Sequence, residues 1–136
     1  METRVMVVGS SKAENKQKKR KPRIRLTGPW LPEIGFEPDC LATAEYQHGH
    51  ITIRLQGSGL DTYQKVVKKA LSSRDGLLQV RLERVSGKCY PHLELTGFWL
   101  EELGFQIGKL MVIRYEYGLI NIHLLDLDEL KARGLF

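Results

Sequence analysis

The sequence predicts a mainly β protein with short helices, built from two copies of one small unit on a single chain. The first observation is an internal repeat. Residues 22–55 align with residues 91–124 without a gap, and 15 of these 34 positions are identical. The second observation is that both copies contain alternating apolar and polar residues, which is typical of strands with one buried face. Because one copy is near the lower size limit for an adequate core, we expect the copies to fold against each other.

The first copy predicts a strand, a short helix and a hairpin, in that order. Residues 22–26 (PRIRL) alternate and open on a proline, which an edge strand tolerates. The next residues, TGPWLPEIGF, place a proline near the first helical position and a glycine where a left-handed residue ends a helix. Residues 40–47 and 50–55 form two further strand patterns, which a tight turn at His48 and Gly49 joins.

The remaining segments extend this pattern. Residues 77–85 predict a leading strand before the second copy, as residues 4–8 do before the first. Residues 59–76 lack proline and place apolar residues at near-helical spacing, which predicts a helical linker. The tail predicts one more short helix. The expected order is a leading strand and basic arm (1–21), a first repeat (22–58), a helical linker (59–76), a second repeat (77–128) and a C-terminal tail (129–136).

The composition is ordinary for a soluble globular protein, with 42% hydrophobic and 27% charged residues. No apolar run approaches the length of a membrane span, and the N-terminus lacks a signal-peptide core, so we expect a cytoplasmic protein without a membrane partner. Cys40 and Cys89 fall at non-equivalent positions of the two copies, which favours reduced thiols over a disulfide framework or a metal site. Neither a metal nor another cofactor is expected.

The net charge of +5 is concentrated in one tract. The segment from Lys12 to Arg25 contains eight basic residues and one acid, Glu14, so the rest of the chain is net acidic. Such a tract favours polyanions such as nucleic acid, although a solvated arm has the same composition. A second basic cluster lies on the linker and the strand after it. The predicted nucleic-acid-binding residues are Lys12, Lys16, Lys18, Lys19, Arg20, Lys21, Arg23, Arg25, Lys65, Lys68, Lys69, Arg74, Arg81 and Arg84.

The two copies resemble a known family. LTGPWLPEIGF with HGHITIRL, and LTGFWLEELGF with YGLINIHL, resemble the core motif of the SymE toxins of type I toxin–antitoxin systems. More distantly, the unit is similar to the swapped-hairpin fold of AbrB and MazE, in which two copies form one small β-barrel, normally as a homodimer. With both copies on one chain, the resemblance implies tandem swapped-hairpin units that form an intramolecular pseudo-dimeric β-barrel. We expect a monomer, and further self-association stays open.

The SymE resemblance implies a toxin that binds RNA and hydrolyses its phosphodiester bonds, as an endoribonuclease does. Metal-free RNA cleavage needs a base near the 2′-hydroxyl, an acid for the leaving oxygen and cations around the phosphorus. The candidate catalytic residues are His48, His50 and Arg54, at the first hairpin turn and on the strand after it. The second copy has Tyr117 and Leu119 where the first has the two histidines, which excludes a doubled symmetric active site. A plain surface role for each histidine stays open.

Two other classes of function stay open. A non-enzymatic AbrB-like DNA-binding or nucleoid-associated protein would need no catalytic residues, and its polyanion would be DNA rather than RNA. An antitoxin-like interaction module would use the net acidic residues 91–136 to hold a basic partner.

The residues that recur in both copies are mostly glycine and apolar, which indicates packing rather than chemistry. We expect the repeated tryptophans, Trp30 and Trp99, to lie in the core. Thr27 and Thr96 precede the glycine at the start of each predicted helix, and we expect their hydroxyls to cap those helices.

Overall fold

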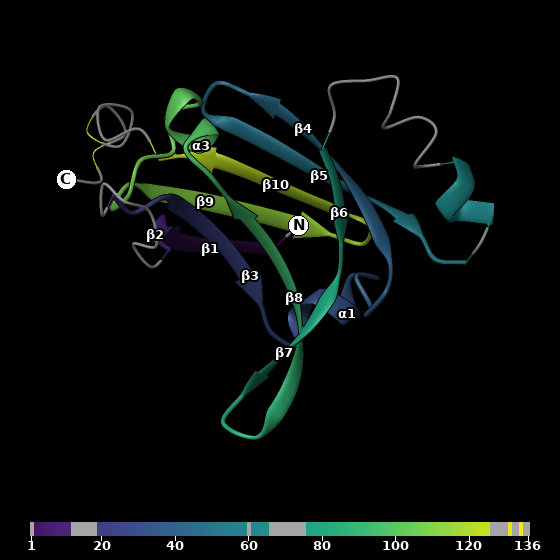
Figure 1. The fold of residues 1–136 in the computed structure, drawn as a ribbon. Helices are drawn as coiled ribbons and strands as arrows, with labels where there is room; N and C mark the ends of the chain where they lie inside the picture. The colour runs from purple at the N-terminus through teal and green to yellow at the C-terminus, as the bar shows by residue number, and fades with distance from the viewer. Residues whose placement is uncertain are drawn as a thin grey trace.

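The computed structural model describes residues 2–11, 19–59, 61–65, 76–125, 131 and 134. It confirms a mainly β protein with short helices (Figure 1). The strands are β1 (Glu2–Val7), β2 (Gly9–Ser10), β3 (Pro22–Thr27), β4 (Leu41–Gln47), β5 (His50–Gly57), β6 (Gly76–Gln79), β7 (Arg81–Val85), β8 (Lys88–Thr96), β9 (Leu110–Glu116) and β10 (Leu119–Leu124). Helices α1 (Trp30–Glu33) and α3 (Trp99–Glu102) are single turns.

The predicted helical linker is only partly described. Residues 61–65 are helical, but residues 66–75 lie outside the described part of the chain, as does most of the C-terminal tail with its expected helix. Within the described ranges, no helix has the length and the apolar character needed to cross a membrane.

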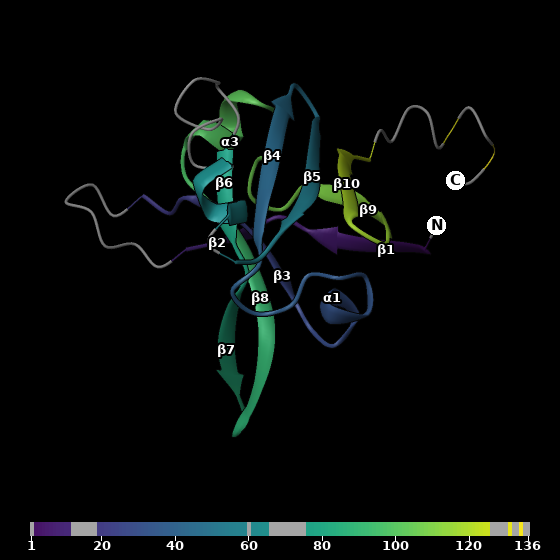
Figure 2. The ribbon, with the colours of Figure 1, turned by 90° about the vertical axis from the view of Figure 1, so that its right-hand side faces the viewer.

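The strands form two antiparallel sheets (Figures 1 and 2). The six-stranded sheet has the order β1-β9-β10-β5-β4-β6, and the four-stranded sheet has the order β2-β3-β8-β7. Both edge strands of the larger sheet continue into edge strands of the smaller one. β1 is followed by the buried Val8 and then β2, and β6 is followed by the buried Val80 and then β7. The predicted single strand at 77–85 is therefore two strands, β6 and β7, in different sheets. The predicted closed β-barrel is also wrong for the described residues, because both sheets end in edge strands.

The order of strand, one-turn helix and hairpin in residues 22–57 recurs in residues 88–124. Strands of the two halves pair directly in both sheets, β10 with β5 and β3 with β8. The leading strands β1 and β6 each pair with a strand of the other half, β1 with β9 and β6 with β4. Each half thus supplies hydrogen-bonding partners for the other, and covers edges that one half alone would expose.

The repeated aromatic residues pack across the two halves. The Trp30 ring lies 4.6 Å from the Tyr115 ring, and the Trp99 ring lies 4.7 Å from the Tyr46 ring. Each indole N–H donates a hydrogen bond to the backbone carbonyl three residues earlier. Trp30 is buried, whereas Trp99 is only partly buried, so the prediction of a core position holds fully for Trp30 alone.

Glycine is required before each helix because the tryptophan folds back over it. Gly28 and Gly97 have φ angles of 142° and 152°, and a Cβ atom at Gly97 would lie 2.4 Å from the Trp99 ring. The predicted threonine caps are wrong, since neither helix has a side-chain hydrogen bond at its N-cap. Thr27 uses its hydroxyl across the sheet instead, and the buried hydroxyl of Thr96 has no hydrogen-bond partner in the structure.

The core lies between the two sheets, and most residues that alternate with the core residues of β3 and β8 are polar. Phe36 and Phe105, which follow the two helices, are fully buried. Alternate residues of β3 and β8 are buried, and the residues between them point away from the core. Charged and hydroxyl side chains occupy those outward positions. The outer face of the four-stranded sheet is therefore a polar surface.

Candidate nucleic-acid interface

The outer face of the four-stranded sheet gathers side chains from β3, β7 and β8. Strand β8 lies between the other two, so His92 has Thr27 opposite it on one side and Arg81 on the other. Arg25 lies opposite Glu94 on the same face. Because residues two apart in a strand share a face, the pairing register alone brings these groups together.

A hydrogen-bonded chain holds the imidazole of His92. Its Nδ1 atom lies 2.9 Å from Thr27 Oγ1, and that hydroxyl donates to Glu83 Oε2 at 3.3 Å. Glu83 Oε2 also lies 3.5 Å from His92 Nδ1, and Glu83 Oε1 forms an ion pair with Arg25. The hydroxyl gives its one proton to Glu83, so His92 Nδ1 supplies the proton of the 2.9 Å contact. This tautomer leaves the lone pair on Nε2, where the ring can accept a proton.

The pKa of His92 is lowered below its ordinary value of 6.5. The main cause is burial, because only 12% of the side chain is exposed and burial penalises the charged imidazolium. The positive charges of Arg25, Arg23 and Arg81 lower the pKa further, and Glu94 opposes them. His92 is therefore mainly neutral near pH 7. A neutral imidazole among guanidinium groups suits a general base that acts on a phosphate-bearing substrate.

A pocket lies against His92 and two of its charged neighbours, Arg81 and Glu94. It has a volume of about 410 Å³ and is formed by residues of β6, β7 and β8. Its lining residues are Leu78, Gln79, Arg81, His92, Glu94 and Thr96. A ligand in this pocket would meet the imidazole and a guanidinium group together.

The predicted nucleic-acid-binding residues fall into three groups. Arg23, Arg25 and Arg81 lie on the face that carries His92, and Arg23 Nε is 3.6 Å from Glu94 Oε1. The segment that leads into β3 carries Lys19, Arg20 and Lys21, and the helical residues 61–65 include Lys65. Arg84 is exposed on the β7–β8 hairpin, which projects from the body in both overall views (Figures 1 and 2). The others, Lys12, Lys16, Lys18, Lys68, Lys69 and Arg74, lie outside the described residues.

The predicted catalytic residues lie on the other sheet and do not converge. His48 is in the β4–β5 turn, and His50 begins β5 beside His123 of β10, with ring centroids 6.3 Å apart. Arg54 is four residues beyond His50 on β5, which at 3.3 Å per residue is roughly 13 Å along the strand. Its Nε atom lies 3.9 Å from a carboxylate oxygen of Glu45. This surface brings two histidines together but does not place the arginine beside them.

Glu83 and His92 were missed by the sequence-based prediction of the site. His92 occupies an outward position of a predicted strand, and pairing the equivalent strands of the two copies in antiparallel would have placed it near Thr27. Glu83 gave no comparable signal. It lies on β7, which is separated from β6 at Val80, and no glycine or proline in the sequence marks that separation.

Comparison with known families shows that part of this chain, less than half of its length, is similar to toxins of toxin–antitoxin systems. The matching model is Toxin SymE, type I toxin-antitoxin system, over residues 3–55 of the chain, and the predicted resemblance to SymE is confirmed there. No curated protein and no solved structure gives a significant match. The matched residues include Arg23, Arg25 and Thr27 and end before Glu83 and His92.

Proposed function

We propose that this protein is a SymE-like toxin that binds RNA and cleaves its phosphodiester bonds with the 2′-hydroxyl as nucleophile. One observation carries the cleavage: a neutral His92, oriented by Thr27 and Glu83, beside arginines on an open sheet face. The SymE match supports the toxin class. The basic residues that lead into β3 favour a polyanionic substrate.

The proposed chemical step uses His92 as the base. Nε2 takes the proton of the 2′-hydroxyl, the 2′-oxygen bonds to phosphorus, and the bond from phosphorus to the 5′-oxygen breaks. The products are a 2′,3′-cyclic phosphate and a 5′-hydroxyl that takes its proton from solvent, and His92 returns its own proton to solvent. Arg81 and Arg23 stabilise the charge that develops on the phosphoryl oxygens. DNA lacks the nucleophile and is not a substrate.

The proposed architecture is an intramolecular pair of AbrB-like swapped-hairpin units, in one chain rather than two. The recurring order of elements and the exchange of β1 and β6 between halves support it. The first copy has Arg23 at the position equivalent to His92, so the pair has one active site and not two. The second copy supplies the base, and the first supplies Thr27 and Arg25.

Binding to single-stranded RNA in EDTA, measured at a series of salt concentrations, tests the proposed substrate. The logarithm of the affinity should fall with the logarithm of the salt concentration by roughly 0.7 per phosphate contact. Replacing residues 12–18 by a Gly/Ser segment of equal length removes three lysines and should reduce that slope by up to about 2. A slope near zero would contradict phosphate binding. Tight binding of duplex DNA with none of RNA would favour an AbrB-like DNA-binding protein.

A further inference from the structure

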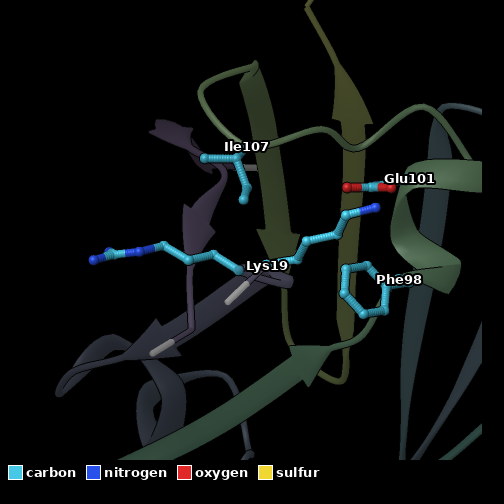
Figure 3. Close-up of a pocket in the computed structure, with 5 residues that line it drawn as sticks. Lys19, Phe98, Glu101 and Ile107 are labelled. Carbon is cyan, nitrogen blue, oxygen red and sulfur yellow. The ribbon is translucent and has the colours of Figure 1, made fainter. Parts of the chain in front are cut away.

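A second pocket, separate from the one at His92, combines an exposed aromatic ring with basic side chains (Figure 3). It has a volume of about 560 Å³. Its lining residues are Lys19, Arg20, Phe98, Glu101 and Ile107. Phe98 is 40% exposed and Ile107 is 45% exposed, so neither side chain is part of the core. A large aromatic ring at a basic surface is a typical platform for a nucleic-acid base.

A backbone hydrogen bond joins two of the segments that form this pocket. The Gly97 N–H donates a hydrogen bond to the Pro22 carbonyl at 3.2 Å, which joins the start of β3 to the start of α3. Phe98 and Glu101 belong to the α3 turn, and the basic residues belong to the segment that enters β3. Lys21 Nζ lies 5.8 Å from the centroid of the Phe98 ring. Positive charge therefore lies beside an exposed aromatic ring.

The repeated unit does not need these side chains for its own fold. The three lining residues from the second copy, Phe98, Glu101 and Ile107, are all prolines in the first copy, at Pro29, Pro32 and Pro38. The backbone is nevertheless closely similar in the two copies, with a single-turn helix in each. The aromatic, acidic and apolar groups are thus a feature of the second copy alone.

We propose that this pocket binds one unpaired guanine nucleotide of single-stranded RNA. The base stacks on Phe98, and its phosphate is bound by Lys19, Arg20 and Lys21. This inference rests on the proposed RNA-binding function and adds a base preference to it. The two pockets are also close along the chain. Thr96, the last residue of β8, lines the pocket at His92 and lies two residues before Phe98.

Glu101 is the group that selects guanine. Figure 3 shows the Lys19 side chain pointing toward the Glu101 carboxylate, so the carboxylate faces the pocket and can accept hydrogen bonds there. Guanine offers two adjacent donors on its Watson–Crick edge, N1–H and the N2 amino group, which match the two oxygens of a carboxylate. Adenine and cytosine offer one amino donor each, and uracil offers one imide N–H. The Lys19 ammonium then binds the phosphate of the same nucleotide.

The test uses the full-length His92→Asn protein, so that no RNA is cut during the measurement. Fluorescence anisotropy compares uridine-rich RNAs that carry one central guanine, inosine, adenine or uracil. We expect the guanine RNA to bind roughly 10-fold or more tightly than the uracil RNA. Inosine lacks the N2 amino group and should bind with intermediate affinity. Glu101→Gln in this background should remove the preference for guanine, so that the guanine and uracil RNAs bind with equal affinity.

Stacking is tested by Phe98→Ala and Phe98→Tyr in the same background. Alanine should lower the affinity for the guanine RNA roughly 10- to 100-fold, and tyrosine should retain it. Val5→Ala, at an apolar residue that is 61% exposed on β1, is the matched control and should change nothing. Equal binding of all four RNAs, or a Phe98→Ala protein that binds like its parent, would overturn the guanine pocket alone. If no RNA binds at all, the proposed RNA-binding function fails with it.

Discussion

Replacing His92 by asparagine should lower the rate of RNA cleavage roughly 10²- to 10⁴-fold. The amide can keep a hydrogen bond to Thr27 but cannot take the proton of the 2′-hydroxyl. RNA binding should be nearly unchanged, because His92 is mainly neutral near pH 7 and the substitution leaves the charge of the surface the same. Single-turnover cleavage of end-labelled RNA, with protein in excess, measures the chemical step separately from binding.

The matched control is His50→Asn, which makes the same change at a predicted catalytic histidine of the other sheet. It should leave the cleavage rate unchanged. The pH profile gives a second check, since the base form is the active form and the pKa of His92 lies below 6.5. The wild-type rate should therefore rise with pH, reach half its maximum below pH 6.5 and then stay level. Loss of cleavage in His50→Asn but not in His92→Asn would move the site to the six-stranded sheet.

Replacing Trp30 by alanine should lower the free energy of unfolding by about 3–5 kcal/mol, a large part of the stability of a domain of this size. The indole is buried against Tyr115 of the other half, and the Arg4 guanidinium carbon lies 5.0 Å from the centroid of its ring. Alanine would leave a cavity where the two halves meet and remove the indole hydrogen bond to the Thr27 carbonyl. Chemical denaturation followed by circular dichroism measures the loss.

Trp99→Ala is the control for this prediction, because Trp99 occupies the equivalent position of the second copy. Its ring packs on Tyr46 in the same way but is only partly buried, so its replacement should cost clearly less. Equal losses of stability in the two variants would contradict the difference in burial between Trp30 and Trp99. A Trp30→Ala protein of wild-type stability would contradict the packing between halves.

The strands and helices were largely predictable, whereas their assembly was not. Alternation in residues 22–26 and 50–55 reports that one side of each strand is buried, and β3 and β5 confirm it. Alternation does not report which strands pair or whether a sheet closes. The segment 77–85 therefore gave one expected strand, while the chain divides it between two sheets at the buried Val80.

The candidate site depends on pairing register more than on composition. Positive charge around β3 was predictable, and Arg23 and Arg25 do lie on the face that carries His92. Their contacts with Glu94 and Glu83, however, follow from pairings between strands far apart in the sequence. A shift of one residue in such a pairing would turn every side chain to the opposite face, so the sequence alone could not bring these groups together.

Analysis of the ends of cleaved RNA tests the proposed function most directly. Purified protein is incubated in EDTA with a single-stranded RNA and with DNA of the same sequence, and the product ends are identified by mass spectrometry. We expect RNA fragments with a 2′,3′-cyclic phosphate and a 5′-hydroxyl, and intact DNA. Intact RNA, or fragments that end in a 3′-hydroxyl and a 5′-phosphate, would contradict cleavage by the 2′-hydroxyl with His92 as its base.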